Sequence, residues 1–241
     1  MIEEICSSCY EKPQGNRVGL GHFVWCPVPH LEEVPRILDV ERASNEDHYA
    51  SKFRITQLSG DHFKSKSKLP VKALALGKTE ELLISKAKKR PCLVVACDNT
   101  SYTDKTVAAE LHGRRHLQDS PMILAPIYGI ASPENETGFP PVMVARIRAL
   151  LYTQFFFVPK TCPTTGIALA KEGIIRLDRL FPASPNRGIS PMNIKLTEEP
   201  LDLLMAMLRA RFGAPPSDSL RAVQEILYEV LPDDCRPPLI N

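Results

Sequence analysis

The chain has 241 residues, which is enough for one or two domains, and 44% of them are hydrophobic, which is enough to fill a core. Lysine and arginine together number 30 against 28 acidic residues, so the overall charge points to no class of partner. No window approaches the roughly 18 apolar residues of a membrane span, and the start Met1-Ile-Glu-Glu lacks the basic and apolar stretches of a signal peptide. We therefore expect a cytoplasmic protein that has no membrane partner.

The seven cysteines are odd in number and some fall at apparent core positions, so reduced thiols are expected in place of a disulfide framework. Cys6-Ser-Ser-Cys9 has the spacing of a metal-binding pair. A zinc site needs two further ligands, for which His112 and His116 are candidates. The alternative is a loose N-terminal tail over residues 1–18 that binds no metal.

The first expected element is a short strand over residues 19–25, after a glycine-rich lead-in. From 27 to about 85 the pattern is mixed, and we interpret this segment as a long insertion with little regular structure of its own. The two expected exceptions are a strand at 52–56 and a short helix near 78–86. Connections of this length are usually functional or disordered.

Positive charge concentrates between Lys64 and Arg90, where nine lysines and arginines stand against two acids, a net charge of 9 − 2 = +7. Because the whole chain is +2, the remainder carries 2 − 7 = −5. Such a stripe is either the footprint of a polyanion such as nucleic acid or a solvated surface run.

The basic stripe ends at an Arg-Pro step that leads into a predicted buried strand over 92–97. Pro91 biases Arg90 towards extended backbone, and the apolar run that follows contains two adjacent valines. Arg90 would then stand on a rigid entry to the core, where a planar guanidinium is held ready for a phosphate. The alternative interpretation is a solvated basic turn before an ordinary strand.

Further strands with irregular connections are predicted downstream. The expected strands are 121–128, 139–148 and 149–158, followed by 166–170 and 173–178, which are either two short strands or one strand interrupted near Gly173. The expected connections are a surface excursion at 106–117 and a flexible link at 129–138. Many short strands separated by glycine and proline favour a small β-barrel over a parallel sheet.

The pattern changes to a helical period near the end of the chain. Thr197 is expected to cap a helix whose first turn carries Glu198 and Glu199 and which ends at Gly213. Its expected core-facing residues are Leu201, Leu204, Met205, Leu208 and Phe212. A second helix over 218–231 repeats the scheme with Leu220, Val223, Ile226, Leu227 and Val230. The fold class is therefore expected to be mainly β with C-terminal helices.

Six fragments of the chain stand in the order in which a known family has them. They are Gly21-His-Phe-Val-Trp25, Arg90-Pro-Cys-Leu-Val-Val-Ala-Cys-Asp-Asn-Thr100, Met122-Ile-Leu-Ala-Pro-Ile-Tyr128, Gly138-Phe-Pro-Pro-Val142, Gly166-Ile-Ala-Leu-Ala170 and Ile174-Ile-Arg-Leu-Asp178. Over about half of its length the chain thus resembles the MazF/PemK family of toxin ribonucleases. The predicted helix at 201–213 falls where the family has its C-terminal helix.

The resemblance implies an SH3-like small β-barrel of the MazF/PemK/CcdB type, a homodimer with a groove across it, and cleavage of single-stranded RNA without a metal or cofactor. It divides the chain into a tail (1–18), a barrel domain (19–213) whose first loop is enlarged by the insertion at 27–85, and a helical extension (214–241). It also implies an antitoxin-like partner whose acidic tail lies in the RNA groove, and the basic stripe complements such a tail.

In the family the arginine of the Arg-Pro step is catalytic, which places that role on Arg90. A second family residue, a threonine, corresponds here to Tyr128, whose hydroxyl can donate to a phosphate oxygen but reaches further and is a poor base. The expected RNA contacts are Lys86, Lys88, Lys89, Thr100 and Ser101. Further candidates are the hydroxyls of Tyr102 and Thr103, and the imidazoles of His22 and His30 as conventional acid–base groups.

Two functions are compatible with these residues. In the first, the protein is an endoribonuclease in which Arg90 stabilises the transition state while the 2′-OH attacks the adjacent phosphate. In the second, it is a catalytically inactive barrel that binds RNA or the tail of a partner protein. The intact Arg90-Pro91 step favours the first function, whereas the replaced threonine and the long insertion favour the second.

Overall fold

The structure is a computed structural model that describes residues 5–15, 17–30, 33–42, 46, 51–64, 74–97, 110, 122–130, 138–184 and 188–237. Strand residues (38%) outnumber helical residues (22%), so the predicted mainly-β class with C-terminal helices is confirmed. Contacts divide the chain into two compact units, each with its own sheet. Unit 1 comprises Met1–Pro27 and Lys89–Asn241, and unit 2 comprises Val28–Lys88.

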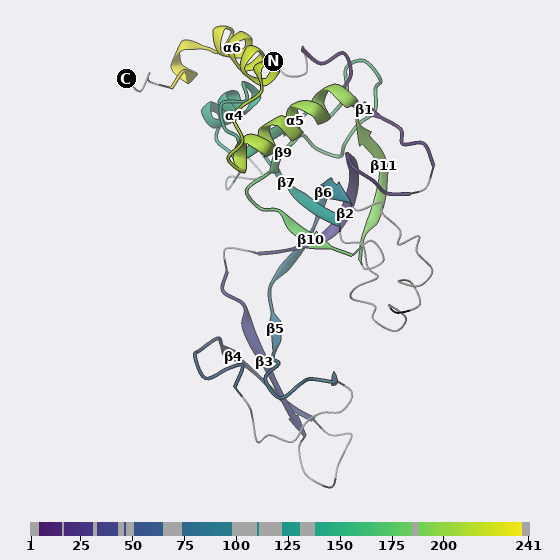
Figure 1. The fold of residues 1–241 in the computed structure, drawn as a ribbon, viewed down its shortest axis with the longest axis vertical. Helices are drawn as coiled ribbons and strands as arrows, with labels where there is room; N and C mark the ends of the chain where they lie inside the picture. Colours follow the sequence, from purple (N-terminus) through teal and green to yellow (C-terminus); the bar gives the residue numbers. More distant parts are fainter. Residues whose placement is uncertain are drawn as a thin grey trace. The chain divides into compact units, whose positions relative to one another are not determined.

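The sheet of unit 1 is antiparallel and curls into a half-barrel (Figure 1). Its strand order is β1-β11-β2-β6-β7-β9-β8, and β10 pairs with β7 off this path. The strands are β1 (Tyr10–Glu11), β2 (His22–Pro29), β6 (Ala87–Cys97), β7 (Met122–Gly129), β8 (Phe155–Val158), β9 (Gly173–Arg176), β10 (Phe181–Ala183) and β11 (Ser190–Leu196). All of the registers given for this sheet are antiparallel, which permits short connections between neighbours.

The apolar runs predicted as strands at 92–97 and 121–128 are confirmed as β6 and β7, and β2, β8 and β9 overlap the other predicted strands. At 166–170 the structure has only an isolated bridge between Thr161 and Ala168. Three strands of this sheet were not predicted: β1, β10 and β11. Only Leu196 of β11 is buried, so its alternation is too weak to identify a strand.

The segment predicted as a strand at 139–148 is instead the helix α4, Pro141–Arg148, so this prediction was wrong. Pro140 and Pro141 stand at the N-cap and first turn, where a missing N–H costs nothing. Val144 and Ile147 are buried one turn apart, which is helical spacing. The β-branched residues suggested a strand, but the paired prolines were the more informative signal.

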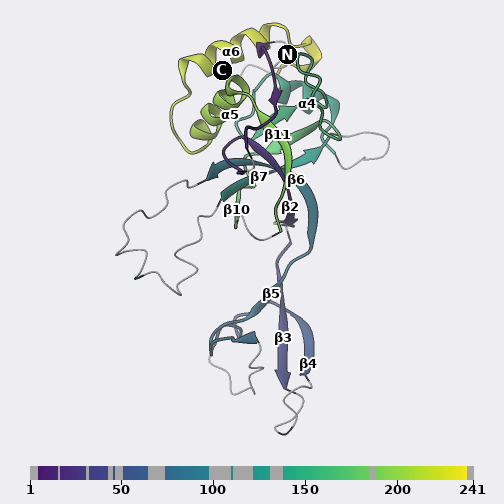
Figure 2. The same ribbon diagram turned by 90° about the vertical axis from the view of Figure 1, so that its right-hand side faces the viewer.

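Two helices follow the sheet, as predicted: α5 (Glu198–Arg211) and α6 (Asp218–Glu229), with a short 3-10 turn, η2, at Asp233–Cys235. Helix α5 lies across the sheet in both views (Figures 1 and 2). Its buried residues are Pro200, Leu204, Met207 and Leu208, whereas Phe212 is 73% exposed and was wrongly assigned to the core face. Gly213 has a φ of +91° and ends the helix, as expected of a left-handed residue.

The predicted capping role of Thr197 is only positional. Thr197 occupies the N-cap of α5, but its hydroxyl donates to the carbonyl of Ser8 and caps no helix N–H. Helix α6 begins with a conventional cap, because the Ser217 hydroxyl accepts the N–H of Leu220 at 3.3 Å.

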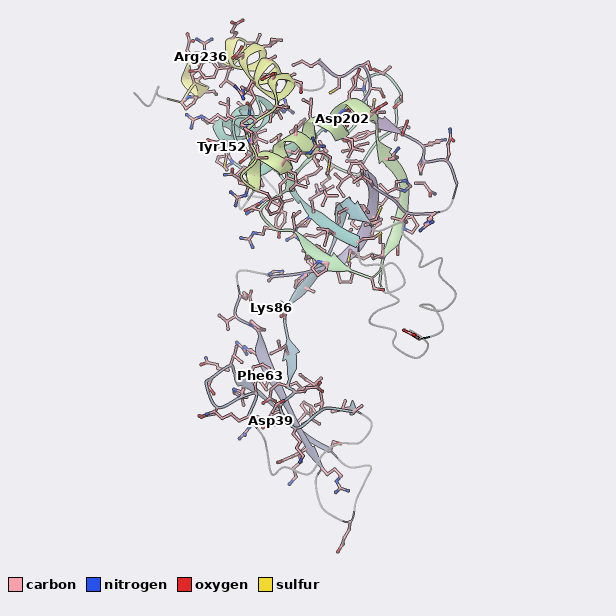
Figure 3. The ribbon with its side chains drawn as sticks, viewed as in Figure 1. Asp39, Phe63, Lys86, Tyr152, Asp202 and Arg236 are labelled. Atoms are coloured by element: carbon pink, nitrogen blue, oxygen red, sulfur yellow. The ribbon has the colours of Figure 1, made fainter. Side chains whose placement is uncertain are left out.

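Part of the segment after 213 contributes to the core of unit 1. Leu220, Leu227 and Cys235 are buried in the same hydrophobic cluster as the sheet. Arg146 of α4 donates from Nε to the carbonyl of Cys235 at 2.8 Å, which ties α4 to η2. Tyr152 and Arg236 mark this region in Figure 3.

The N-terminal residues that the structure describes are also packed. Tyr10 is fully buried, pairs with Leu196 in the β1–β11 ladder, and donates its hydroxyl to the carbonyl of Pro159. Cys6 and Cys9 belong to the same core cluster. The alternative of a loose tail is therefore wrong for residues 5–11.

Unit 2 has more regular structure than expected. It contains a three-stranded antiparallel sheet in the order β4-β3-β5, built from β3 (Arg36–Arg42), β4 (Ser51–Gln57) and β5 (Leu82–Ile84). The predicted strand at 52–56 is confirmed as β4. The predicted helix near 78–86 was wrong, because Leu82–Ile84 pairs with Arg36–Leu38 of β3 and tertiary pairing overrides the local propensity.

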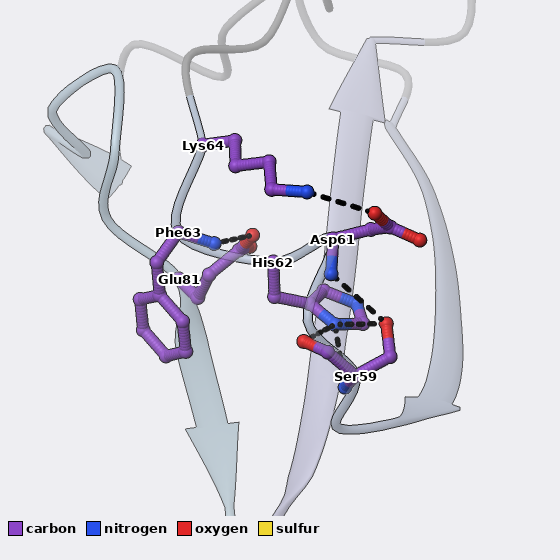
Figure 4. Close-up of polar contacts among 6 residues, drawn as sticks. All are labelled: Ser59, Asp61, His62, Phe63, Lys64 and Glu81. Carbon is purple, nitrogen blue, oxygen red and sulfur yellow. Dashed lines mark hydrogen bonds and ion pairs between the residues drawn. The ribbon is translucent and has the colours of Figure 1, made fainter.

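A polar turn follows β4 (Figure 4). The backbone N–H of Ser59 donates to Nδ1 of His62 at 3.0 Å, and Lys64 forms an ion pair with Asp61 at 2.9 Å. The N–H of Phe63, whose φ is +62°, donates to Glu81 at 3.2 Å. This last bond joins the turn to the residue before β5.

The close approach of β9 to β7 gives a test of the sheet of unit 1. A Cβ on Gly173 would lie 2.6 Å from Cγ2 of Ile127 and 3.0 Å from the carbonyl oxygen of Tyr128. Gly173→Ala is therefore expected to lower the unfolding free energy of unit 1 by about 1–3 kcal/mol, the usual cost of overpacking. Urea unfolding followed by fluorescence of Trp25, the single tryptophan and a residue of unit 1, measures it.

Gly19→Ala is the matched control, because a Cβ there meets nothing within 4 Å. It should change the unfolding free energy by less than about 0.5 kcal/mol. Equal effects of the two substitutions would contradict the close packing of β7 and β9.

Candidate functional site

Strand pairing places Arg90 beside Tyr128. Cys92 of β6 is opposite Pro126 of β7, and continuing this register by two residues puts Arg90 opposite Tyr128. The guanidinium carbon of Arg90 lies 4.3 Å from the centroid of the Tyr128 ring, which is a cation–π contact. The two residues expected to be catalytic are therefore brought together, and they meet through the ring of the tyrosine.

A second arginine approaches the same ring from the next strand. The guanidinium carbon of Arg176 lies 5.4 Å from the centroid of Tyr128, 5.1 Å from that of Phe155 and 5.9 Å from that of Phe139. The register explains this grouping, because Phe155 of β8 is directly opposite Arg176 of β9. We call the resulting group the arginine–aromatic cluster: Arg90, Tyr128, Phe139, Phe155, Arg176 and Asp178.

Arg176 and Asp178 form a two-pronged ion pair. Nε of Arg176 donates to Oδ1 at 2.7 Å and Nη2 donates to Oδ2 at 2.5 Å, and the two side chains are only 17% and 21% exposed. Burial alone raises the pKa of the Asp178 carboxyl, but the hydrogen bonds and charge of Arg176 outweigh it and hold the pKa below its ordinary value. Asp178 is therefore a weak base whose charge offsets that of Arg176.

Arg90 differs from Arg176 in its charge balance. In the part of the chain that the structure describes, no carboxylate forms an ion pair with the half-buried Arg90. The cluster thus holds two guanidinium groups and one carboxylate and has an excess positive charge at Arg90. A guanidinium with its donors directed away from other protein anions suits a phosphate or carboxylate ligand.

A third arginine is stacked and paired in the same unit. The guanidinium of Arg148 lies 4.1 Å from the centroid of Phe157 and forms an ion pair with Glu172 at 3.4 Å. Arg148 and Arg176 are thus both neutralised by a neighbouring acid, which sets Arg90 apart from them.

The predicted RNA-binding lysines are not equivalent. Nζ of Lys86 forms an ion pair with Glu33 at 3.1 Å inside unit 2. Lys88 and Lys89 are exposed and directly precede Arg90 in β6. Because successive side chains of a strand point to opposite faces, Lys89 points away from the face that carries Arg90. The predicted residues Thr100 and Ser101, with Tyr102 and Thr103, lie outside the described residues.

Neither histidine candidate belongs to the arginine–aromatic cluster. His22 is half-buried in β2 opposite Lys195, and burial first, then the charge of Lys195, lowers its pKa below the ordinary value against the opposing effect of Glu11. The charges that act on it therefore come from β11 and β1. His30 lies in unit 2, where Nδ1 is 3.6 Å from Glu33.

The metal hypothesis gains no support from the described residues. None of their histidine, cysteine, aspartate and glutamate side chains form a group of three or more that could hold an ion. The proposed ligands His112 and His116 lie outside the described residues. All seven cysteines are described, and none of them forms a disulfide.

Arg176, Asp178, Phe139 and Phe155 were not expected in the site. The sequence did contain one usable signal, since Arg176 and Asp178 are two residues apart at a predicted strand and so share one face. The two phenylalanines could not be placed, because their contacts depend on the β8–β9 register and on the loop before α4.

Comparisons with protein-family models, with curated proteins and with solved structures found no match to this chain. Among the described residues, no helix has the length and apolar character needed to cross a membrane.

The ion pair of Asp178 with Arg176 predicts a pH dependence of stability. Since the folded-state pKa of Asp178 lies below its unfolded value of about 3.9, the pair stabilises unit 1 above that pH and loses its effect as pH falls through the folded-state pKa. Asp178→Asn should therefore cost about 1–3 kcal/mol near neutral pH, and this difference should close in acid. Urea unfolding across a pH series measures the difference.

Asp202→Asn on α5 is the matched control, because it also replaces a carboxylate by an amide but at an exposed position. It should show little difference from the unaltered protein at any pH. A cost of Asp178→Asn that stays constant down to strongly acid pH would contradict the ion pair as its source.

Proposed function

We propose that this protein is a metal-independent endoribonuclease of the MazF/PemK type that acts on single-stranded RNA at the Arg90–Tyr128 pair. The observation that carries the proposal is the position of Arg90: it is stacked on a ring, 4.3 Å from the Tyr128 centroid, and has no carboxylate partner among the described residues. The order of the six sequence fragments adds to it. The proposed architecture is an SH3-like barrel, for which the curled antiparallel sheet is suitable.

Arg90 would act on the charge of the transition state. Attack of the 2′-OH on the adjacent phosphorus places extra negative charge on the non-bridging oxygens, and the leaving 5′-oxygen takes up a proton. A guanidinium keeps its proton at neutral pH, so Arg90 donates hydrogen bonds to those oxygens and is no base. The stack on Tyr128 and the extended backbone before Pro91 hold the guanidinium in place before the substrate arrives.

Tyr128 would have two roles that can be separated. Its ring orients Arg90 through the cation–π contact. Its hydroxyl would donate to a phosphate oxygen. Lys88 and Lys89 precede Arg90 in the chain, are exposed, and would attract RNA by their charge.

The second candidate function is a barrel that binds RNA, or the acidic tail of a partner protein, without cleaving anything. One observation favours it: the carboxylate in the arginine–aromatic cluster, Asp178, is held by Arg176 with a lowered pKa and is a weak base. A homodimer and an antitoxin-like partner belong to the proposal under either function. Light scattering of the purified protein tests the dimer.

The cleavage assay uses a long single-stranded RNA and the purified full chain in EDTA. The unaltered protein should cleave it, and Arg90→Ala should lower the rate by about 10²–10³-fold, as for loss of one preorganised donor to a developing oxyanion. Tyr128→Phe keeps the ring and removes the hydroxyl. A small change in the cleavage rate would show that the ring is the part of Tyr128 that matters, whereas a loss of rate comparable to that of Arg90→Ala would show that the hydroxyl is needed. Gel analysis of the fragments gives the rates.

Arg211→Ala is the matched control, since it removes one exposed arginine from the last turn of α5. It should leave the rate unchanged. If the folded, partner-free protein leaves the RNA intact, the endoribonuclease proposal fails, and filter retention of the RNA over a salt series then tests the binding function. Cleavage that is equal in Arg90→Ala would exclude Arg90 from the reaction.

A further inference from the structure

Cys162 lies directly beneath an exposed turn. Its side chain is fully buried, but Thr161, Pro163, Thr164 and Thr165 around it are exposed. The turn is closed by the N–H of Gly166, which donates to the carbonyl of Cys162 at 3.0 Å. Cys162 is therefore a buried residue whose immediate neighbours in the chain are exposed to solvent.

The sulfur of Cys162 faces hydrogen-bond donors from the N-terminal segment. The backbone N–H of Cys9 donates to Sγ at 3.3 Å, and the hydroxyl of Ser8 lies 3.6 Å away. Burial raises the pKa of the Cys162 thiol, but hydrogen bonds to the sulfur, among them that from the backbone N–H of Cys9, outweigh it and lower the pKa to about 5. The thiolate is the nucleophilic form of cysteine.

Other buried cysteines lack this arrangement. Burial, then the neighbouring Cys26, raises the pKa of Cys92 far above its ordinary value, and burial likewise raises that of Cys26. Both are inert thiols at neutral pH, although Cys92 and Cys162 are equally buried. The difference in thiol pKa comes from the hydrogen-bond donors around Cys162. Cys92 and Cys26 therefore serve as internal controls for the reactivity of Cys162.

The same contacts bring a second cysteine to Cys162. The backbone nitrogen of Cys9 lies 3.3 Å from Sγ of Cys162, so the two cysteines are in direct contact although they are 153 positions apart in sequence. Thr164 holds this segment in place by donating to the carbonyl of Ser7 at 2.7 Å, and Thr165 does so at the carbonyl of Tyr10 at 3.1 Å. The Cys6–Cys9 motif thus meets a third cysteine distant in sequence.

We propose that Cys162 and Cys9 form a two-cysteine site that is oxidised by peroxides, and that this site is independent of the Arg90 cluster. The Cys162 thiolate supplies two electrons and attacks one peroxide oxygen, the O–O bond breaks, and the leaving oxygen takes a proton from solvent. The sulfenic acid so formed is attacked by the Cys9 sulfur, which gives up its proton while the hydroxyl leaves as water. One hydrogen peroxide and two thiols yield one disulfide and two waters.

The experiment treats the full chain with hydrogen peroxide at neutral pH, labels the remaining thiols with a maleimide in denaturant, and maps the peptides by mass spectrometry. The expected product is a disulfide between Cys9 and Cys162, formed at least about tenfold faster than any loss of Cys92 or Cys26 thiols. Cys92→Ser should leave the reaction unchanged. Cys9→Ser should stop it at a sulfenic acid on Cys162, which dimedone traps.

Thr165→Val keeps the proposal testable where substitution of Cys162 itself impairs folding, because Thr165 is exposed and the exchange is close in size. The exchange removes the hydrogen bond from Thr165 to the carbonyl of Tyr10, which holds the N-terminal segment against the turn, and should slow formation of the disulfide several-fold. Uniform oxidation of all seven cysteines, a disulfide that joins Cys6 to Cys9, or no oxidation before unfolding would each overturn the proposal.

Discussion

The antiparallel pairing of β6 with β7 and of β7 with β9 determines where the arginine–aromatic cluster lies. Arg90 is opposite Tyr128 because Cys92 is opposite Pro126, and Arg176 reaches the same ring because β9 follows on the other side of β7. A one-residue slip of either strand would turn its side chains to the other face. Gly173 supports this register, since only a residue without a side chain fits against Ile127 there.

Arg90 and Arg176 both contact the ring of Tyr128, but they differ in whether a carboxylate neutralises them. Arg176 forms a partly buried ion pair with Asp178. It also packs against three aromatic rings, so its role is structural. Arg90 contacts the ring, but no carboxylate of the residues that the structure describes forms an ion pair with it. Stacking on the ring restricts the orientation of a guanidinium but leaves its charge, so Arg90 is both oriented and charged.

The sequence predicted the parts of the fold whose periodicity is long or strongly apolar. β6, β7, α5 and α6 belong to this group. It failed where a short segment depends on a distant partner: Leu82–Ile84 becomes a strand only beside β3, and Tyr10–Glu11 only beside β11. At the site, Arg90 and Tyr128 were identified through the family resemblance. Asp178 and the phenylalanines were not, because their contacts arise from strand register, which no local pattern encodes.

The attachment of the N-terminal segment has a consequence for how the chain folds. Ser7 donates from its backbone to Glu199 across 192 positions of sequence, and β1 pairs with β11 at the same place. Contacts between such distant residues cost loop entropy before they return any stabilisation, so they form late and slowly. On the ribosome, β1 cannot pair until nearly all of unit 1 has been synthesised. Until then Cys6, Cys9 and Tyr10, which are buried in the folded protein, remain accessible to chaperones and oxidants.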